Sequence, residues 1–355
     1  MSMSVYHEEL KIKETQLLRE VQQDLPPFLQ EFFRGISQTT STKTRLAYAY
    51  DLRVFFRYLY EEHDKLGGIA AQNLQVTDLN QITSEDIDCF LEYLSYYVHS
   101  NSENPAQQTQ HHNEEKGKSR KLASIRSMFK YFYKKGKLSG NPATLVDTPK
   151  IHEKKITRLD VNEMANFLDA VESGEYLTDR QKARHEKTKK RDLALITLLL
   201  GTGMRVSECV GINRKDLDFQ NHAVKVLRKG GNEVMLYFGE EVAEALSDYL
   251  EERNQTITKE DGEDALFLSS QGKRISVRAV QNLVKKYAHG VTAKNISPHK
   301  LRSTYGTNLY QETGDIYLVA DTLGHADVNT TRKHYAEIEE NRRRRAASFI
   351  KLRKD

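Results

Sequence analysis

Apolar residues in the first half of the chain recur at the three- and four-residue spacing of amphipathic helices. Leucine and phenylalanine follow this spacing in residues 43–60, and a second such run covers residues 120–135. Because an α-helix turns once every 3.6 residues, the pattern predicts two helices that each bury one face. Gly136 ends the second of them. Its apolar face carries Leu122, Ile125, Phe129 and Phe132.

Three stretches without an apolar period divide the chain. Residues 99–117 are polar and irregular, which indicates a long loop, and residues 172–191 are rich in charge. Residues 142–158 combine proline with charge and indicate a linker. We therefore predict two domains, residues 1–150 and 155–355. Residues 1–30 form an N-terminal extension of the first domain.

The second domain alternates predicted helices with one predicted hairpin. Helices are expected at 160–171 and at 192–200, where the second run reads as buried. Residues 222–228 alternate apolar and polar side chains, and Gly230-Gly231-Asn232 precedes a second strand at 233–238. This arrangement is typical of a β-hairpin with a glycine-rich turn. The predicted fold class is mainly α: a helical first domain, and a mainly helical second domain with a small antiparallel sheet.

Composition indicates the cellular compartment in which the protein is expected. The chain has 355 residues, of which 38% are hydrophobic and 29% charged. It contains no apolar run of about 18 residues, so we expect no membrane span, and its first residues contain no apolar signal segment. The two cysteines, Cys89 and Cys209, are too few for a disulfide framework. A cytoplasmic protein is expected.

Charge is unevenly distributed along the chain. The net charge is +4, yet residues 101–150 hold ten lysines and arginines against four acidic residues, and residues 51–100 hold three against nine. Further basic clusters lie at 180–191 and 342–345. Clustered cations favour a nucleic-acid partner. An ordinary solvated surface explains the same clusters equally well.

Two arginines and a histidine suit the binding of a phosphodiester. Arg205 follows a Gly-Thr-Gly turn and precedes an expected helix start. Arg302 lies three residues after His299, so on a helix both point the same way. Guanidinium is planar, permanently charged and donates two parallel hydrogen bonds, which fits the non-bridging oxygens of a phosphate. Each arginine taken alone is more often a surface or ion-paired residue.

Three more side chains complete a candidate reaction centre. Tyr335 is the candidate nucleophile, and a phenol with a pKa of about 10 needs a nearby base or cation to attack. His299 can accept its proton, His325 can hydrogen-bond the phosphate, and Lys229 at the hairpin tip can protonate the leaving 5′ oxygen. The alternatives are a half-buried tyrosine, one of 18 in the chain, and a solvated lysine.

No metal or nucleotide-hydrolysis site is predicted. His111-His112 lies beside Glu114-Glu115, but the segment reads as a loop and supplies no further ligands. A G-x-x-x-x-G-K-[ST] loop does not occur in the sequence. We therefore expect no cofactor and no metal.

The combined order of these residues resembles the tyrosine recombinase (phage integrase) family, and within it the Xer branch. The matching segments are GTGMRVSE, RKGGNE, SPHKLRSTYGT, LGH and TTRKHYAEI. TSTKTRLAYAYDLRVFFRYL and RKLASIRSMFKYFYKKGKLSGNPA resemble the helical DNA-gripping domain of the Xer branch, so the resemblance covers roughly residues 25–345. The lysine turn departs from the family's usual Gly-Lys-Gly, because Arg228 precedes Lys229 here.

The resemblance implies a residue-by-residue assignment. Arg205 and Arg302 bind the phosphate, Lys229 is the acid, His299 assists proton transfer, His325 completes the pocket and Tyr335 is the nucleophile. The tyrosine forms a 3′-phosphotyrosyl link that conserves bond energy, so neither ATP nor metal is required. We expect DNA contacts in the first domain from Lys43, Arg45, Lys118, Arg120, Lys121, Arg126 and Lys130.

The resemblance also implies partners. We expect four protomers to act on two short inverted-repeat sites in duplex DNA, with a DNA translocase as a candidate accessory partner. The tail, residues 337–355, is expected to form a helix that docks on a neighbouring subunit rather than on its own. The expected function is resolution of chromosome dimers at a dif-like site. Alternatives are a mobile-element integrase or transposase, a type IB topoisomerase, and a DNA-binding protein without catalysis.

Overall fold

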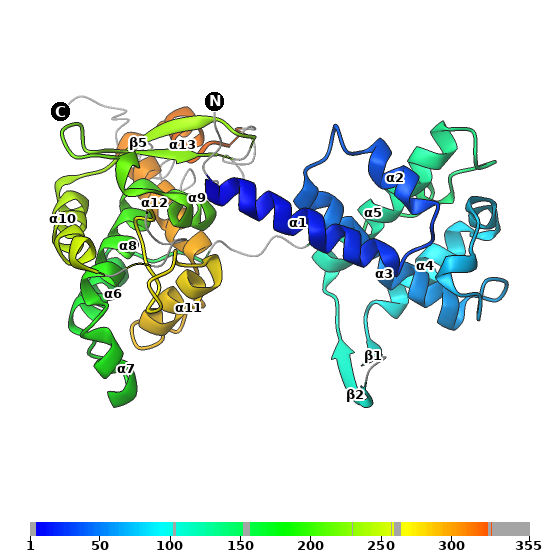
Figure 1. Ribbon diagram of the computed structural model, residues 1–355, viewed down its shortest axis with the longest axis horizontal. Coiled ribbons are helices and arrows are strands. Elements are labelled where there is room, and N and C mark those ends of the chain that lie inside the picture. Colours follow the sequence, from blue (N-terminus) through cyan, green and yellow to red (C-terminus); the bar gives the residue numbers. More distant parts are fainter. Residues whose placement is uncertain are drawn as a thin grey trace, which may run out of the picture. The chain divides into compact units, whose positions relative to one another are not determined.

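The computed structural model describes residues 5–101, 104–151, 157–228, 230–256 and 264–325, with positions 258 and 328. The chain divides into two compact units, Met1–Glu153 and Lys154–Asp355, referred to below as the N-terminal unit and the C-terminal unit. Both are mainly helical (Figure 1). No helix in the described part of the chain is long and apolar enough to cross a membrane.

The N-terminal unit is a bundle of helices with one hairpin. The helices are α1 (Val5–Gln23), α2 (Leu29–Gly35), α3 (Thr42–Glu62), α4 (Ser84–Tyr93) and α5 (Glu115–Lys134). Short 3-10 turns lie at Ala71–Asn73, Val76–Gln81 and Pro142–Thr144. The predicted helices at 43–60 and 120–135 are thus confirmed as α3 and α5. Helix α3 begins where the Ser41 hydroxyl accepts a hydrogen bond from the Thr44 N–H at 3.2 Å, an N-cap that satisfies one unpaired donor.

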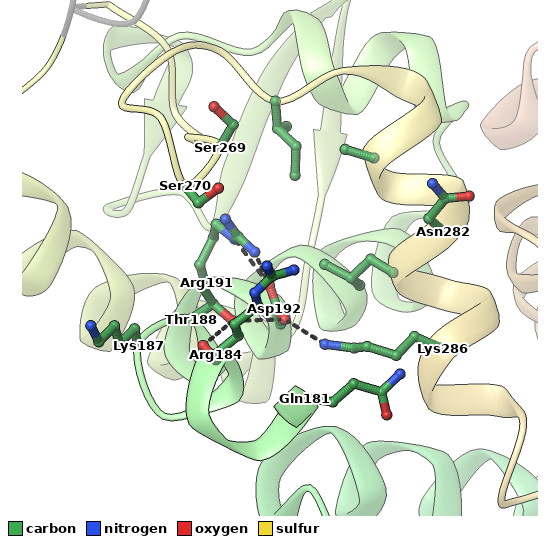
Figure 2. Close-up of a pocket in the computed structure, with 13 residues that line it drawn as sticks. Gln181, Arg184, Lys187, Thr188, Arg191, Asp192, Ser269, Ser270, Asn282 and Lys286 are labelled. Carbon is green, nitrogen blue, oxygen red and sulfur yellow. Dashed lines mark hydrogen bonds and ion pairs between the residues drawn. The ribbon is translucent and has the colours of Figure 1, made fainter. Parts of the chain in front are cut away.

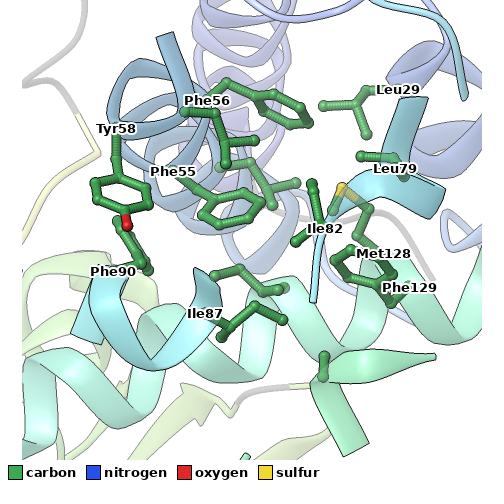
Figure 3. Close-up of a cluster of buried hydrophobic side chains, with 14 of the residues drawn as sticks. Leu29, Phe55, Phe56, Tyr58, Leu79, Ile82, Ile87, Phe90, Met128 and Phe129 are labelled. Carbon is green, nitrogen blue, oxygen red and sulfur yellow. The ribbon is translucent and has the colours of Figure 1, made fainter. Parts of the chain in front are cut away.

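Aromatic side chains fill the core of the N-terminal unit. Phe55 of α3 and Phe90 of α4 are fully buried, and their rings meet edge to face with centroids 5.1 Å apart (Figure 3). Phe129 and Phe132 of α5 are also fully buried. Such rings bury large apolar areas and favour edge-to-face contact, so burial of apolar faces holds α3, α4 and α5 together.

The segment at 99–117 differs from its prediction. Strands β1 (Tyr97–Asn101) and β2 (Asn104–His111) form an antiparallel hairpin there, with Tyr97 opposite His111 and Val98 opposite Gln110. The hairpin projects from the helices of its unit (Figure 1). The expected long loop was wrong because this pairing depends on backbone hydrogen bonds, which polar Gln, Asn and Thr residues can make without an alternating apolar pattern.

Helix α8 (Lys189–Thr202) lies buried at the centre of the C-terminal unit. The other helices of this unit are α6 (Val161–Ser173), α7 (Asp179–His185), α9 (Val206–Gly211), α10 (Glu240–Gln255), α11 (Val277–Ala288), α12 (Pro298–Thr313) and α13 (Ile316–Leu323). A 3-10 turn lies at Arg214–Asp216. Helix α8 is buried from Ala194 to Leu200 and packs against α6, α10 and α12, which confirms the buried helix predicted at 192–200.

A small antiparallel sheet carries the predicted hairpin. Strands β3 (Leu217–Asp218), β4 (Ala223–Leu227) and β5 (Glu233–Tyr237) follow in that order across the sheet. Val226 pairs with Val234, and the two antiparallel strands confirm the predicted hairpin. Gly230 and Gly231 take φ values of +100° and +87°, a backbone region that glycine alone adopts without strain. The mainly helical fold class with a small antiparallel sheet is confirmed.

Candidate active site

Three arginines of the C-terminal unit meet at the last turn of α13. The final carbonyls of an α-helix lack partners within the helix, and the helix dipole makes this end negative. Gly324 ends the helix in the left-handed conformation with φ +61°, and its N–H bonds back to the Asp321 carbonyl at 2.8 Å. This end of the helix is therefore suited to binding cationic side chains.

Arg205 reaches this helix end from the turn that follows α8. Its Nη2 donates to the Gly324 carbonyl at 3.1 Å, and its Nη1 donates to Glu208 Oε1 at 2.8 Å. The backbone N–H of Arg205 donates to the other Glu208 oxygen, also at 2.8 Å. The carboxylate of Glu208 is almost fully buried, whereas 36% of the Arg205 side chain is exposed. Glu208 thus fixes the guanidinium while leaving part of it accessible to a ligand.

Arg302 reaches the same helix end from α12. It is buried, its Nη1 donates to the Gly203 carbonyl at 2.7 Å, and its Nη2 donates to the Leu323 carbonyl. Gly203 has φ +62°, and a Cβ there would lie 2.3 Å from a ring carbon of Tyr305. Glycine is therefore required at this position, both for the backbone conformation and for the close approach of α12.

A third arginine completes the group. Arg228, at the end of β4, donates from Nη1 to the Asp321 carbonyl at 3.2 Å and from Nη2 to the Thr322 carbonyl at 2.6 Å. Four consecutive carbonyls, 321 to 324, therefore accept hydrogen bonds from three arginines. We call Arg205, Arg228 and Arg302 the arginine cluster. Its like charges are held together by the helix dipole and by Glu208.

Both predicted histidines lie on elements that adjoin the cluster. His299 is exposed in the first turn of α12, one turn before Arg302, with Pro298 at the start of the helix. His325 is half-buried directly after Gly324, and its backbone N–H donates to the Ala320 carbonyl at 2.9 Å. The positive end of α12 and the arginine cluster together favour an anion at this place.

Two predicted residues lie outside the part of the chain that the structure describes. Lys229 falls between Arg228 and Gly230, both of which are described, and Tyr335 lies beyond residue 328. The expected tail helix at 337–355 also lies outside the described residues. Their roles remain predictions.

Sequence reasoning missed Glu208 and the structural use of Arg228. Glu208 sits three residues after Arg205, which is the spacing of a capping box and was a usable signal. The two hydrogen bonds from Arg228 to α13 span sequence separations of 93 and 94 residues, so no local pattern predicts them.

Five of the seven basic residues predicted to contact DNA in the N-terminal unit make contacts within that unit. Lys43 and Lys130 are exposed, while Lys118 donates to Ser95 Oγ at 2.6 Å and Arg45 donates to Thr42 Oγ1 at 3.2 Å. The other three, Arg120, Lys121 and Arg126, make internal ion pairs or hydrogen bonds.

Arg120 and Lys121 surround a buried carboxylate. Arg120 lies 2.7 Å from Asp51 Oδ1, and Lys121, only 6% exposed, lies 3.9 Å from the same atom. Burial raises the pKa of Asp51 to about 6, although the two cations oppose the shift. Lys121 also donates to Asn113 Oδ1 at 2.8 Å. Its ammonium group is thus used inside the unit.

Arg126 secures the segment that follows α5. It donates to the Ala143 carbonyl at 3.0 Å, to Thr148 Oγ1 at 2.7 Å and to the Val146 carbonyl. The first part of the stretch predicted as a linker, 142–148, is therefore packed on the N-terminal unit.

A second basic feature, a pocket of about 620 Å³, lies at the other end of α8 (Figure 2). It is lined by α7, the start of α8, α11 and residues 269–275. Asp192 is fully buried there and is held by Arg191 at 2.6 Å, Tyr287 at 2.8 Å and Lys286 at 3.5 Å. A helix of this length separates the pocket from the arginine cluster by about 20 Å. The charged stretch at 172–191 is thus partly structural.

No group of three or more His, Cys, Asp or Glu side chains that could hold a metal ion occurs among the described residues. The arginine cluster with its two adjoining histidines is consequently the strongest candidate site in the described part of the chain. It offers fixed positive charge and two imidazoles, which suit binding of a phosphodiester and proton transfer around it.

Comparison with known proteins agrees with this chemistry. Residues 157–342 match the model of the phage integrase family. The chain is 34% identical over 332 residues to a protein named tyrosine recombinase XerC from Caldanaerobacter subterraneus subsp. tengcongensis, a match that covers 91% of this chain and 86% of the relative.

Solved structures show the same fold. The XerH site-specific recombinase bound to a palindromic difH substrate matches with a TM-score of 0.59 at 20% identity, covering 82% of this chain and 75% of that one. The Tn1549 transposon integrase in complex with circular intermediate DNA matches with a TM-score of 0.61 at 19% identity, covering 87% and 95%. The matched family and the XerC relative together establish that this chain belongs to the phage integrase family and is a tyrosine recombinase.

Proposed function

We propose that this enzyme is a site-specific recombinase that cuts and rejoins duplex DNA through a 3′-phosphotyrosyl intermediate on Tyr335. The observation that carries the proposal is the convergence of Arg205 and Arg302 on the adjacent carbonyls of Leu323 and Gly324. Two guanidiniums held side by side match the two non-bridging oxygens of one phosphate.

The proposed reaction conserves bonds and needs no energy source. The Tyr335 oxygen attacks the scissile phosphorus while His299 accepts the phenolic proton. The bond from phosphorus to the 5′ oxygen breaks, and Lys229 donates the proton that this oxygen requires. Arg205 and Arg302 stabilise the charge that develops on the non-bridging oxygens, and His325 hydrogen-bonds the phosphate. Attack by a 5′-hydroxyl of the partner strand reverses these steps and releases the tyrosine.

We further propose that the N-terminal unit grips the DNA through its exposed cations. Lys43 and Lys130 are exposed, and Lys118, Arg45 and Arg120 lie on the same unit. Lys121 and Arg126 contribute by holding the unit's own structure. The enzyme then acts as a tetramer on two inverted-repeat sites, with the tail at 337–355 docked on a neighbouring subunit.

We propose resolution of chromosome dimers at a dif-like site as the biological role, in the cytoplasm and with a DNA translocase as accessory partner. We also propose that this enzyme is of the XerS kind, a single-enzyme recombinase that works alone. The fold shared with a transposon integrase keeps recombination of a mobile element as the second candidate. Purified enzyme that recombines chromosomal sites without a second recombinase supports the first role, and action only on the ends of a mobile element supports the second.

Formation of a covalent adduct tests the chemistry. A duplex nicked near the scissile phosphate traps the intermediate. Cleavage releases a short fragment that carries the 5′-hydroxyl, and once this fragment has diffused away the strand cannot be rejoined. Wild-type enzyme is expected to form a denaturation-resistant adduct in EDTA without ATP, and Tyr335→Phe is expected to bind the duplex equally well and form none. An adduct on Tyr335→Phe would exclude this tyrosine as the nucleophile. The absence of any adduct with the wild type, despite tight binding, would favour a DNA-binding protein without catalysis.

A further inference from the structure

Arg228 ties the β4–β5 turn to the end of α13. Its two terminal nitrogens donate to the Asp321 and Thr322 carbonyls at 3.2 and 2.6 Å. The guanidinium also lies against Gly324, where an added Cβ would come within 2.5 Å of Arg228 Nη1. The fork of a single side chain therefore spans two carbonyls and packs on the backbone beside His325.

The backbone of Arg228 is fixed equally firmly within its own hairpin. Its N–H donates to the Asn232 carbonyl at 2.8 Å, and its carbonyl accepts from the Gly231 N–H at 3.1 Å. These bonds close the turn around Gly230 and Gly231. Arg228 is thus held on one side by the turn and on the other by α13, which also carries the carbonyls that hold Arg205 and Arg302.

Lys229 is covalently attached to this anchor. A turn with two glycines has few conformational restraints of its own, and a lysine side chain adds four flexible carbons. A firm anchor one residue away from a flexible side chain limits the positions that such a side chain can reach. Proton transfer in a transition state requires donor and acceptor within hydrogen-bond reach, so this restriction bears directly on catalysis.

We propose that Arg228 is a positioning residue that holds Lys229 in register with Arg205 and Arg302. The proposal rests on the proposed role of Lys229 as the general acid. Arg228 acts through the turn and through α13, and it is not itself assigned to the phosphate or to the leaving oxygen.

A substrate that needs no general acid separates the two roles. In a duplex whose scissile phosphate carries sulfur in place of the 5′ bridging oxygen, Tyr335 attacks phosphorus, the bond to sulfur breaks and a thiolate leaves with the electron pair. Thiols ionise near pH 8.5 and alcohols far above that, so the thiolate departs without a proton. Single-turnover cleavage of oxygen and sulfur substrates is measured for wild type, Arg228→Ala, Arg228→Lys and Lys229→Ala.

Lys225→Ala is the matched control. Lys225 lies on the same strand, is 44% exposed and pairs with Glu233 at 3.6 Å. Its removal changes the charge of the hairpin equally without touching α13. It is expected to cleave both substrates at the wild-type rate.

The expected result is selective rescue by sulfur. Arg228→Ala should cleave the oxygen substrate roughly 10- to 100-fold more slowly, a loss typical of misplacing a catalytic group, and should cleave the sulfur substrate within about threefold of wild type. Arg228→Lys should fall between, because an ammonium cannot span two carbonyls as the fork does. Rescue by sulfur also shows that the variant is folded and binds DNA.

Other outcomes overturn the proposal in distinguishable ways. Equal slowing of Arg228→Ala on both substrates would mean that Arg228 supports the arginine cluster or His325 instead of Lys229. Cleavage of the oxygen substrate at the wild-type rate by Arg228→Ala would mean that the contact between Arg228 and α13 does not position Lys229. Wild-type cleavage of the oxygen substrate by Lys229→Ala would remove the general-acid role itself. If Arg228→Ala does not fold, the same comparison for Arg228→Lys decides between these results.

Discussion

Cations in the two units of this enzyme are used in different ways. In the N-terminal unit, Lys121 and Arg126 satisfy buried groups of their own unit, a carboxylate in one case and carbonyls in the other. In the C-terminal unit, which carries the candidate active site and is called the catalytic unit below, Arg205, Arg228 and Arg302 converge on one helix end. A run of positive charge in the sequence therefore includes cations that serve their own unit. The motif arginines, in contrast, are brought together at one place in the fold.

The largest effect is expected from loss of a motif arginine. Arg302→Ala should slow single-turnover cleavage by roughly 10²–10³-fold, as does loss of one preorganised donor to a developing oxyanion. Binding of the duplex should change little, since many other phosphate contacts remain. Cleavage and affinity are measured on the same nicked duplex. If the affinity for the duplex fell as much as the cleavage rate, Arg302 would be a general DNA contact. The two units would then not differ in how they use their cations.

A stability effect is expected from Arg126. Arg126→Ala leaves the carbonyls of Ala143 and Val146 without this donor and should destabilise the N-terminal unit by about 1–3 kcal/mol. Urea unfolding followed by circular dichroism measures the change. Cleavage by the folded variant on saturating DNA should stay near the wild-type rate. Unchanged stability together with a weaker salt dependence of binding would instead make Arg126 a phosphate contact.

Lys130 provides the opposite case in the same helix. It is exposed on α5, so Lys130→Ala should leave stability unchanged. Its loss should weaken binding to all sequences alike and reduce the salt slope of the affinity by about one. Fluorescence anisotropy at several salt concentrations gives the slope. A slope equal to that of the wild type would remove Lys130 from the proposed DNA surface.

The smallest effects are those of pH, and they have opposite signs in the two units. Burial raises the pKa of Asp51 from 3.8 to about 6, so the folded N-terminal unit binds more protons than the unfolded chain between these values. Its stability should therefore fall as pH rises from about 4 to 6. Asp51→Asn should flatten this dependence. Asp24→Asn, at a 59% exposed surface carboxylate paired with Arg53, is the control and should not.

Glu163 in the catalytic unit behaves in the reverse way. Burial by itself would raise its pKa, but hydrogen bonds from Lys294, Asp160 N–H and Thr292 outweigh burial and lower the pKa from 4.5 to about 2. The stability it contributes is present above pH 4.5 and is lost as pH falls towards 2. Glu163→Gln should therefore weaken the catalytic unit at pH 7 and leave it unchanged at pH 2. Hydrogen exchange resolved by peptide distinguishes the two units, and the same sign in both would contradict the account.

Periodic patterns in the sequence predicted the elements that bury apolar faces. Helices α3, α5 and α8 and the β4–β5 hairpin were all foreseen, because burial imposes a regular spacing on their side chains. The β1–β2 hairpin was not, since its polar strands pair through backbone groups. The buried Asp51 and Asp192 also escaped prediction, because a charge run looks alike whether it is solvated or paired across the fold.

The sequence predicted the motif residues of the candidate site, but it did not predict the contacts that hold them in place. Local order singled out Arg205, His299, Arg302 and His325 as candidates. The carbonyls of α13 that gather the arginines carry no side-chain signature, and Arg228 meets them across more than ninety residues. Contacts of this kind arise from tertiary packing, which spacing alone does not encode.

Cleavage of a charge-neutral substrate tests the proposed phosphate-binding role of Arg302 most directly. Replacing one non-bridging oxygen of the scissile phosphate by a methyl group removes the negative charge that Arg302 is proposed to stabilise. The loss of roughly 10²–10³-fold expected for Arg302→Ala on the natural phosphate should shrink to within about tenfold on the methylphosphonate. An equal loss on both substrates would show that Arg302 does not act on the charge of the scissile phosphate, and the proposed site would then be wrong.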